Sequence, residues 1–257
     1  MKEAPVRTDR EGDFVVLTLC QPERRNPLSD ETLGELLALL TEAGTSDARG
    51  VILAAEGPVF SAGHDYRDLD ERDHAGTHEL LSLCRDVMRT IQGLPQPVVA
   101  EVNGLATAGG CQLVASCDLA IAGVSSRFAV PGGRGGWFCT TPGVALARAV
   151  GRKHALEMLL TGDPIDSATA LSWGLVNRMV PDDTVPAATR ELLSRATRGS
   201  RVSKAIGKRA FYEQVDLDTE SAYDLATDVM ASSSQEDDAR EGIRAFLEKR
   251  RPNFTKN

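Results

Sequence analysis

Two segments rich in small residues have the composition of loops that bring backbone amides close to a ligand. The first is Phe60-Ser-Ala-Gly-His-Asp-Tyr-Arg67, which follows an apolar run, and the second is Asn103-Gly-Leu-Ala-Thr-Ala-Gly-Gly-Cys111. Glycine allows close backbone approach, and free N–H groups where a strand passes into a helix favour negative charge. The two segments therefore indicate a site that stabilises charge on an oxygen atom, through amides of residues 62–64 and 108–110.

The side chains near these segments offer less to acid–base or nucleophilic chemistry. The His64 ring could act as an acid or a base, but we expect only its amide to take part. Cys111 and Cys139 have no histidine close in the sequence to activate them, so we expect buried, inert thiols. Trp137 and Phe138 are better suited to line an acyl pocket than to perform chemistry.

Alternating strands and helices must position these loops. Strands are predicted at residues 14–19, 50–55, 98–102 and 119–122, and helices from Ser29 and over residues 77–93. This order implies an α/β fold with a largely parallel sheet, whose ligands gather at the C-terminal ends of the strands. Beyond about residue 143 we expect helices and no strand that extends the sheet. The predicted helices are 143–149, 151–161, 167–173, 184–200, 201–214, 216–231 and 236–249.

The bulk composition excludes several classes of partner. The 257 residues are 42% hydrophobic and 26% charged, with a net charge of −8 and a pI of about 5.1. This charge argues against nucleic acid or an anionic membrane as the main partner. No apolar stretch is long enough to span a membrane. The five cysteines show neither metal-ligand spacing nor a disulfide framework, and residues 1–5 lack a secretory pattern, so we expect a cytoplasmic protein.

The pair of glycine-rich loops, about 45 residues apart, resembles the crotonase (enoyl-CoA hydratase/isomerase) superfamily. The resemblance covers almost the whole chain, including residues 22–28, 116–120, 160–162, 165–170, 174–177 and 241–254. It implies a ββα spiral core over residues 1–195 and a helical C-terminal subdomain over residues 196–257 that takes part in oligomerisation. It also implies a homotrimer or a homohexamer.

The resemblance assigns roles to particular residues. Members of this superfamily hold the oxygen of an acyl-CoA thioester between two amides, which here are those of His64 and Gly109. The acyl-CoA is the substrate, and neither a further cofactor nor a metal ion is implied. The resemblance implies that Phe246 and Lys249 reach the nucleotide end of the acyl-CoA from a neighbouring subunit. The remaining positions implied to bind substrate are Arg24, Arg25, Ala62, Asp65, Tyr66, Arg67 and Trp137.

The sequence departs from the hydratase pattern at both positions where the resemblance places a catalytic glutamate. Gln112 occupies the first position and Gly132 the second. Neither residue exchanges a proton near neutral pH, so we expect no hydration by the usual mechanism. Two further functions stay open: a decarboxylase or thioesterase that uses the two amides alone, as glutamate-free members of the superfamily permit, and a catalytically silent acyl-CoA-binding scaffold.

Overall fold

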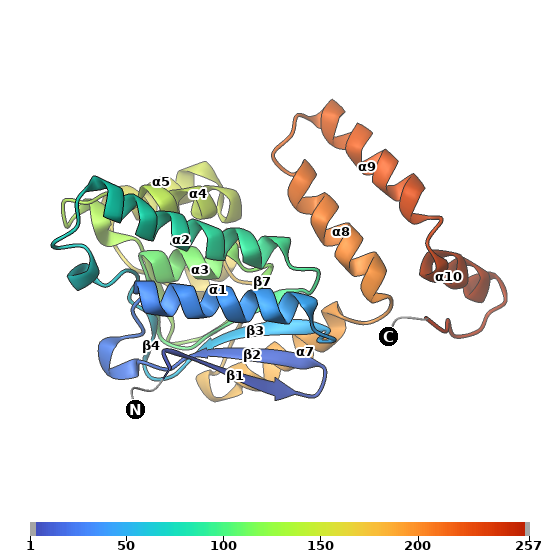
Figure 1. Cartoon of the computed structure of the whole chain (residues 1–257), viewed down its shortest axis with the longest axis horizontal. Coiled ribbons are helices and arrows are strands. Elements are labelled where there is room, and N and C mark those ends of the chain that lie inside the picture. The colour runs from blue at the N-terminus through green and yellow to red at the C-terminus, as the bar shows by residue number, and fades with distance from the viewer. Residues whose placement is uncertain (1–3, 255–257) are drawn as a thin grey trace.

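The structure is a computed structural model that describes residues 4–254. Residues 1–3 of the N-terminal segment and residues 255–257 of the predicted C-terminal subdomain lie outside the described residues. A mixed α/β core is followed by three helices, α8 to α10, that extend away from it as an arm (Figure 1). In the described part of the chain, no helix is long and apolar enough to cross a membrane.

A six-stranded sheet forms the centre of the core. Its order is β1-β2-β3-β5-β7-β10, in which β1 pairs antiparallel with β2 and the other pairs are parallel. The central strands are near-continuous apolar runs because both of their faces are buried. The ranges are β1 (Val6–Glu11), β2 (Phe14–Leu19), β3 (Gly50–Ala55), β5 (Val98–Val102), β7 (Leu119–Gly123) and β10 (Arg178–Val180).

A second, four-stranded sheet carries the two glycine-rich loops. Its order is β4-β6-β8-β9, with β4, β6 and β8 parallel and β9 antiparallel to β8. The strands are β4 (Val59–Ser61), β6 (Leu105–Thr107), β8 (Arg127–Ala129) and β9 (Ile165–Asp166). Because β4 and β6 are parallel neighbours, the loops that follow them emerge side by side at one edge.

Helices cover both faces of the six-stranded sheet. Leu17, Leu53 and Ala100 belong to the core under α1 and α2, whereas Val16 and Ile52 pack with Val185 and Leu193 of α7 on the other face. Alternate residues therefore point to opposite faces, as the strand geometry requires. The helices are α1 (Asp30–Thr45), α2 (His74–Gly93), α3 (Gly109–Ser116), α4 (Thr140–Ala149), α5 (Gly151–Thr161), α6 (Ser167–Trp173), α7 (Val185–Ala196), α8 (Arg201–Gln214), α9 (Thr219–Ser233) and α10 (Asp237–Leu247).

The prediction that no strand after residue 143 extends the sheet is wrong. Strand β10 pairs with β7 in parallel, with Arg178 opposite Ile121, and forms one edge of the main sheet. The predicted C-terminal end of the helix over residues 184–200 is also wrong. Helix α7 stops at Ala196 because Gly199 has a positive φ of 88° and Ser200 caps α8, its side chain accepting from Ser203 N.

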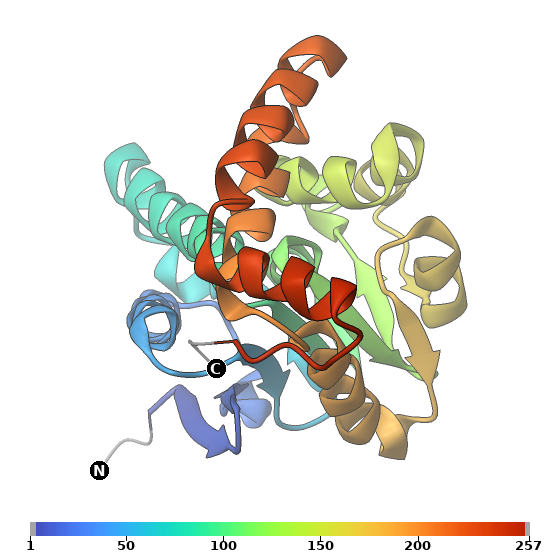
Figure 2. The same ribbon diagram turned by 90° about the vertical axis from the view of Figure 1, so that its right-hand side faces the viewer.

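The arm is anchored to the core through a buried ion pair. The Lys208 ammonium of α8 donates to Asp118 Oδ2 at 2.6 Å and to the carbonyl oxygens of Ile91 and Gln96 at 2.9 Å. Tyr212 donates its hydroxyl to Asp118 Oδ1 at 2.8 Å. Asp118, which follows the second glycine-rich loop and α3, therefore ties α8 to the sheet. Figure 1 shows α9 and α10 on the side of α8 away from the sheet, and in Figure 2, which views the molecule from that side, α10 lies in front of the core.

Candidate active site

The loops after β4 and β6 approach so closely that only glycine fits at their contact. A Cβ atom added to Gly63 would lie 2.8 Å from Gly109 N and 2.9 Å from Ala108 Cβ, and Gly63 has a positive φ of 82°. A Cβ atom on Gly110 would lie 2.3 Å from Ser61 O. These contacts are shorter than any side chain tolerates, so glycine is what allows the two loops to form one site.

Two amides at this contact are left as free donors, whereas their neighbours are occupied. The Ala62 and Ala108 amides donate to backbone carbonyls at 2.9 Å, and the Gly63 amide donates to Ser61 Oγ at 3.2 Å. Among residues 4–254, no such bond is formed by the amide of His64 or of Gly109. Both residues line the same cavity. The two amides that donate to no carbonyl thus belong to residues that line one small space.

Ala108 sets the direction of the second amide. It is the residue before α3 and has φ of 50° and ψ of −118°, a region that non-glycine residues seldom occupy. Such a conformation costs about 1–3 kcal/mol and persists only where surrounding packing imposes it. The strain lies directly before Gly109, at the start of a helix whose dipole favours negative charge.

The cavity at the two amides is small, about 70 Å³. Tyr66 and Trp137 lie in its wall and are 67% and 43% exposed, so the cavity has an aromatic rim open to solvent. None of the residues in its wall is a carboxylate. The wall consists of Ala62, His64, Tyr66, Leu81, Ala108, Gly109, Gly132, Trp137, Phe138, Cys139, Thr140, Thr141 and Pro142.

The His64 ring is largely buried and anchored through its Nδ1 atom. Its Nδ1 atom lies 3.2 Å from Leu28 O, and its Nε2 atom is buried without a partner among the described residues. Burial lowers the pKa of the ring below its usual value, which favours neutral imidazole near pH 7. Neutral Nδ1–H then donates to Leu28 O, so the ring fixes the loop that presents the His64 amide.

Gly132 is packed so tightly that it leaves no room for a side chain. A Cβ atom there would lie 2.2 Å from Trp137 O and 2.6 Å from Cys139 Sγ. Cys139 itself is buried, and burial raises the pKa of its thiol. Cys111 lies in the core, where burial raises its pKa to about 12 and keeps it neutral.

Gln112 faces a second, larger space of about 670 Å³ between α2, α3 and α4, called the distal chamber below. Leu81 and Thr141 line both spaces, so the chamber adjoins the small cavity. Gln112 is 5% exposed, and its Oε1 atom has no partner among the described residues. The one carboxylate in the chamber wall, Asp216, is paired with Arg148 at 2.8 Å.

Asp65 organises a basic cluster directly after the first loop. Its carboxylate accepts from the Arg24 guanidinium and from Arg67 at 2.9 and 3.1 Å. The hydrogen bonds from Arg67, more than those from Arg24, lower the pKa of Asp65 to about 2. Arg24, Arg67 and Arg25 are exposed, and Arg25 has a positive φ of 62°. The guanidinium groups of Arg24 and Arg67 are thus held together on Asp65, the residue after His64.

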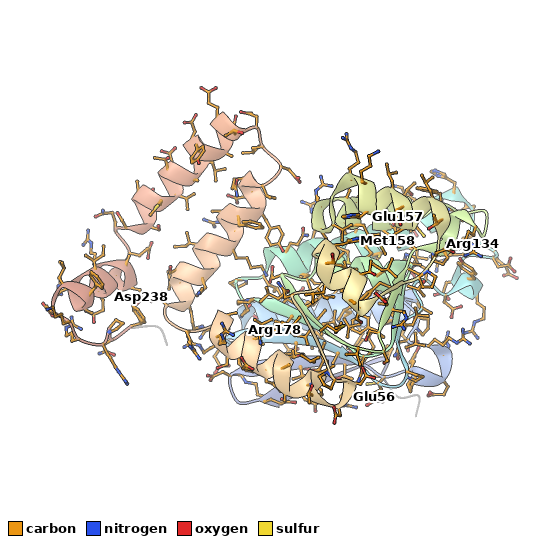
Figure 3. The ribbon with its side chains drawn as sticks, turned by 180° about the vertical axis from the view of Figure 1, so that it is seen from behind. Glu56, Arg134, Glu157, Met158, Arg178 and Asp238 are labelled. Atoms are coloured by element: carbon orange, nitrogen blue, oxygen red, sulfur yellow. The ribbon has the colours of Figure 1, made fainter. Side chains whose placement is uncertain are left out.

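Phe246 and Lys249 are not brought to this cluster within one chain. Both are exposed, and Phe246 is 82% exposed near the end of α10. Figure 1 shows α10 at the far end of the arm, away from β4 and α3. Arg134, labelled in Figure 3, pairs with Asp163 at 2.9 Å and is absent from the walls of both spaces.

Comparison with known proteins decides the family. Residues 9–257 match the enoyl-CoA hydratase/isomerase family model. The mouse mitochondrial protein called enoyl-CoA hydratase domain-containing protein 3 is 46% identical over 92% of this chain and 79% of its own length. A putative enoyl-CoA hydratase of Thermus thermophilus is 35% identical over 95% of this chain and 98% of its own. This chain belongs to the enoyl-CoA hydratase/isomerase family.

Solved structures of the family share the fold throughout. An enoyl-CoA hydratase of Mycobacterium smegmatis superposes with a TM-score of 0.94 at 44% identity, covering 98% of this chain and 99% of that one. The human enoyl-CoA hydratase domain-containing protein 3 superposes with a TM-score of 0.93 at 43% identity. The match covers 97% of this chain and 100% of that one. The predicted superfamily and the crotonase-like α/β fold are thereby confirmed.

Several features of the site have no counterpart in the sequence-based prediction. No local pattern indicated that Cys139 Sγ and Trp137 O would fill the space beside Gly132, or that Leu81 would stand between two spaces. The 3.6-residue pattern of α2 was one available signal, because it places Leu81, Arg85 and Arg89 along one face of that helix. The correspondence of Gln112 and Gly132 to the glutamate positions of hydratases stays a prediction.

Proposed function

We propose that this protein binds an acyl-CoA thioester, holds the thioester oxygen between the amides of His64 and Gly109, and stabilises an enolate there. The observation that carries the proposal is the pair of free amides at one cavity whose wall has no carboxylate. Fixed donors stabilise the developing oxyanion without reorganising, and loss of one donor costs about 3–4 kcal/mol in enzymes that depend on it. The coenzyme A part is the substrate's own, and no further cofactor is proposed.

The basic cluster supports binding of the nucleotide end. The guanidinium groups of Arg24 and Arg67 are fixed by Asp65, whose low pKa keeps it charged across the physiological range. Guanidinium groups pair well with phosphate. In this proposal Arg24, Arg25, Tyr66 and Arg67 contact the nucleotide and pantetheine, and Trp137 lines the acyl entrance. Phe246 and Lys249 would act from a neighbouring subunit.

Hydration is not the reaction that we propose. It requires one group that gives and one that takes a proton, and Gln112 and Gly132 supply neither. Decarboxylation fits the site better: loss of CO₂ leaves an electron pair on the α carbon as the thioester enolate, which the two amides stabilise before solvent protonates it. Thioester hydrolysis and silent binding of acyl-CoA by a scaffold are the two remaining candidate functions.

Two measurements test the proposal. Crotonyl-CoA absorbance at high protein concentration should show no hydration at rates typical of enzymes, about 1–1000 per second; turnover in that range would contradict our assignment of positions 112 and 132. A panel of CoA thioesters analysed by mass spectrometry then separates the candidate functions. Product from a malonyl-type thioester supports decarboxylation, free acid supports hydrolysis, and tight binding without product supports the scaffold.

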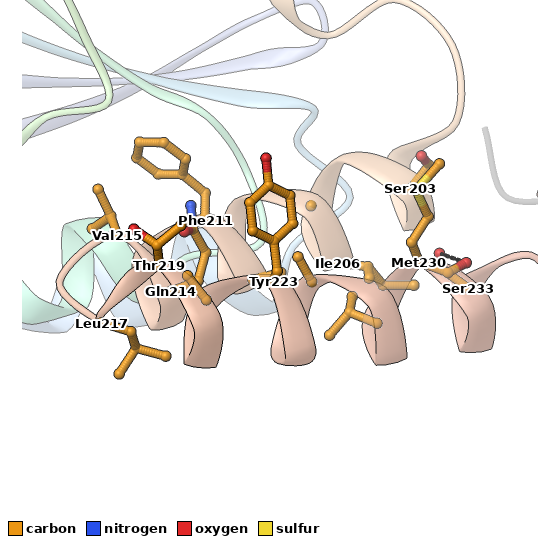
Figure 4. Close-up of a pocket in the computed structure, with 15 residues that line it drawn as sticks. Ser203, Ile206, Phe211, Gln214, Val215, Leu217, Thr219, Tyr223, Met230 and Ser233 are labelled. Atoms are coloured by element: carbon orange, nitrogen blue, oxygen red, sulfur yellow. Dashed lines mark hydrogen bonds between the residues drawn. The ribbon is translucent and has the colours of Figure 1, made fainter.

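We also propose that the chain assembles as a homotrimer or homohexamer through the arm. Helices α8 and α9 enclose an apolar groove of about 790 Å³ (Figure 4), with Phe211, Tyr223 and Met230 55%, 70% and 77% exposed. Exposed apolar side chains gathered in one groove are typical of an interaction surface. Native mass spectrometry should show the oligomer, Met230→Asp should weaken it, and Asp224→Ser, an exposed residue outside the groove wall, should leave it unchanged.

The proposed cellular location is the cytoplasm. It rests on five cysteines without a disulfide among the described residues, as expected in a reducing compartment. The mouse and human relatives are mitochondrial proteins by name. Imaging of the tagged full chain in its own cells tests the location directly, and signal confined to an organelle would contradict it.

A further inference from the structure

The distal chamber begins about one helical turn beyond the oxyanion amides. Gln112 follows Gly109 by three residues on α3, which is about 5 Å along the helix axis. Leu81 and Thr141 form the boundary between the two spaces. An acyl chain whose carbonyl lies at Gly109 therefore has this chamber as an adjoining large space for its far end.

One wall of the chamber is unusually basic for an acidic protein. Helix α2 buries one face in the core and turns a second face to the chamber. Arg85 and Arg89 lie one turn apart on this second face, and like charges at this spacing destabilise a helix. The α2 residues in the chamber wall are His78, Leu81, Ser82, Arg85, Met88, Arg89 and Gln92.

Only one of the chamber's arginines lacks a partner among the described residues. Arg85 pairs with Asp86 at 2.8 Å, and Arg148 pairs with Asp216 at 2.8 Å. Arg89 is exposed and forms no ion pair or side-chain hydrogen bond with any residue in the range 4–254. With the other charges compensated, the guanidinium of Arg89 is the free positive charge in this part of the chamber wall. Its five donors suit a carboxylate held in two hydrogen bonds.

The floor of the chamber is polar as well. Gln112 is almost fully buried, and its Oε1 atom has no donor among the described residues. The nearby Ser116 hydroxyl is already used, because it donates to Gln112 O at 2.8 Å. An unbranched hydrocarbon chain would leave the Gln112 amide unsatisfied, which costs about 1–3 kcal/mol. Oε1 is an acceptor, so a hydrogen-bond donor such as a water molecule held with the ligand would satisfy it, whereas a carboxylate would not.

We infer that the distal chamber selects an acyl-CoA whose acyl group ends in a second carboxylate, and that Arg89 is the residue that binds this carboxylate. The inference rests on the proposed acyl-CoA binding at His64 and Gly109. Arg89 lies eight residues beyond Leu81 on α2, about 12 Å along the helix. The ligand class is therefore a medium-length dicarboxylic acid joined to coenzyme A through one end.

The test compares two thioesters of equal length. Suberyl-CoA and octanoyl-CoA differ at the far end, where the first carries a carboxylate. Their Kd values are measured by titration calorimetry with the wild-type protein, Arg89→Ala, Arg89→Lys and the control Arg152→Ala, which removes an exposed arginine of α5 outside the chamber. Thermal melting confirms that each variant is folded.

The expected result is a loss confined to the dicarboxylic ligand. Arg89→Ala should weaken suberyl-CoA about tenfold, which corresponds to about 1.4 kcal/mol, and change octanoyl-CoA less than twofold. Arg89→Lys should keep part of the affinity, and Arg152→Ala all of it. Equal weakening of both ligands, or no weakening of suberyl-CoA, would overturn the role of Arg89 while leaving the proposed function intact. Failure of the wild type to bind either thioester would instead refute acyl-CoA binding itself.

Discussion

The two sides of the candidate site make different demands on the chain. At His64 and Gly109 the chemical groups are backbone amides, held by glycine contacts that no side chain could replace. At Gln112 and Gly132 the chemistry of a hydratase would depend on side chains, and neither residue exchanges protons. In the proposed function, carbonyl polarisation and acid–base chemistry are separable, because the first depends on backbone packing and the second on single side chains.

The largest expected effect is on the amide side. Gly109→Pro deletes one N–H at the first helical position, where proline is otherwise tolerated. Turnover of whichever thioester proves reactive should fall about 100- to 1000-fold. Gly109→Ala is the matched control, because it keeps the amide; its Cβ comes nearest to the movable Leu28 Cδ1, at 3.1 Å, and meets Gly63 Cα and His64 Cδ2 at the ordinary contact distances of 3.5 and 3.8 Å. Equal kinetics for the proline and alanine variants would mean that this amide is not used.

Restoring an acid at the second position should fail. Gly132→Glu would push a side chain against Trp137 O and Cys139 Sγ, and we expect it to reduce the free energy of unfolding by about 3 kcal/mol without creating hydratase activity. Gly135→Glu, in the same loop, is the control, because a Cβ there would meet only Gly132 O at 3.6 Å. Chemical denaturation measures the stability of both variants. A Gly132→Glu protein that is as stable as the wild type and hydrates crotonyl-CoA would show that position 132 has room for a side chain.

Gln112→Glu should be tolerated but sensitive to pH. Burial at this position would raise the pKa of the new carboxyl above its ordinary value of about 4.3. Below that pH the carboxyl is neutral in both the folded and the unfolded state, so the variant should have the same free energy of unfolding as the wild type. As the pH rises from about 4.3 to the raised pKa of the folded state, the free energy of unfolding of the variant should fall by about 1.4 kcal/mol per unit of pKa shift. Unfolding curves at pH 4 and pH 8 measure this, and parallel behaviour of variant and wild type would place Gln112 in water.

The smallest effect concerns the His64 ring. Burial lowers its pKa in the native state, so the unfolded chain binds more protons below about pH 6.5. Its contribution to stability is complete above that pH and declines as pH falls, by at most about 1.4 kcal/mol per pH unit. His64→Gln should flatten this decline in melts between pH 5 and pH 7. An unchanged slope would indicate an exposed ring.

The parts of the fold that the sequence predicted are those with long apolar patterns. Strands β2, β3 and β5 were predicted with their observed ends because they are continuous apolar runs in a parallel sheet. Six strands were missed. Five of them, β4, β6, β8, β9 and β10, have two or three residues, and their assignment depends on a partner strand distant in the sequence. The sixth, β1, has six residues but no apolar run, because all of its residues after Val6 are exposed.

In the candidate site, as in the fold, the features with a local sequence pattern were predicted and those that depend on distant contacts were not. The two loops follow from local glycine patterns, because a strand-to-helix turn is a local feature. The filling of the Gly132 space and the division between cavity and chamber depend on contacts of Cys139, Leu81 and Thr141 with residues on other elements. No local pattern encodes such packing. The roles assigned to site residues stay predictions until a ligand is bound.

The most direct test of the central claim observes the carbonyl itself. An acyl-CoA labelled with ¹³C at the thioester carbonyl is bound to the protein, and its NMR shift and infrared stretch are compared with those of the free ligand. Two hydrogen bonds to one oxygen polarise the carbonyl, so we predict a downfield ¹³C shift and a lower stretching frequency, retained in His64→Gln and reduced in Gly109→Pro. A bound thioester with the spectrum of the free ligand would contradict the account.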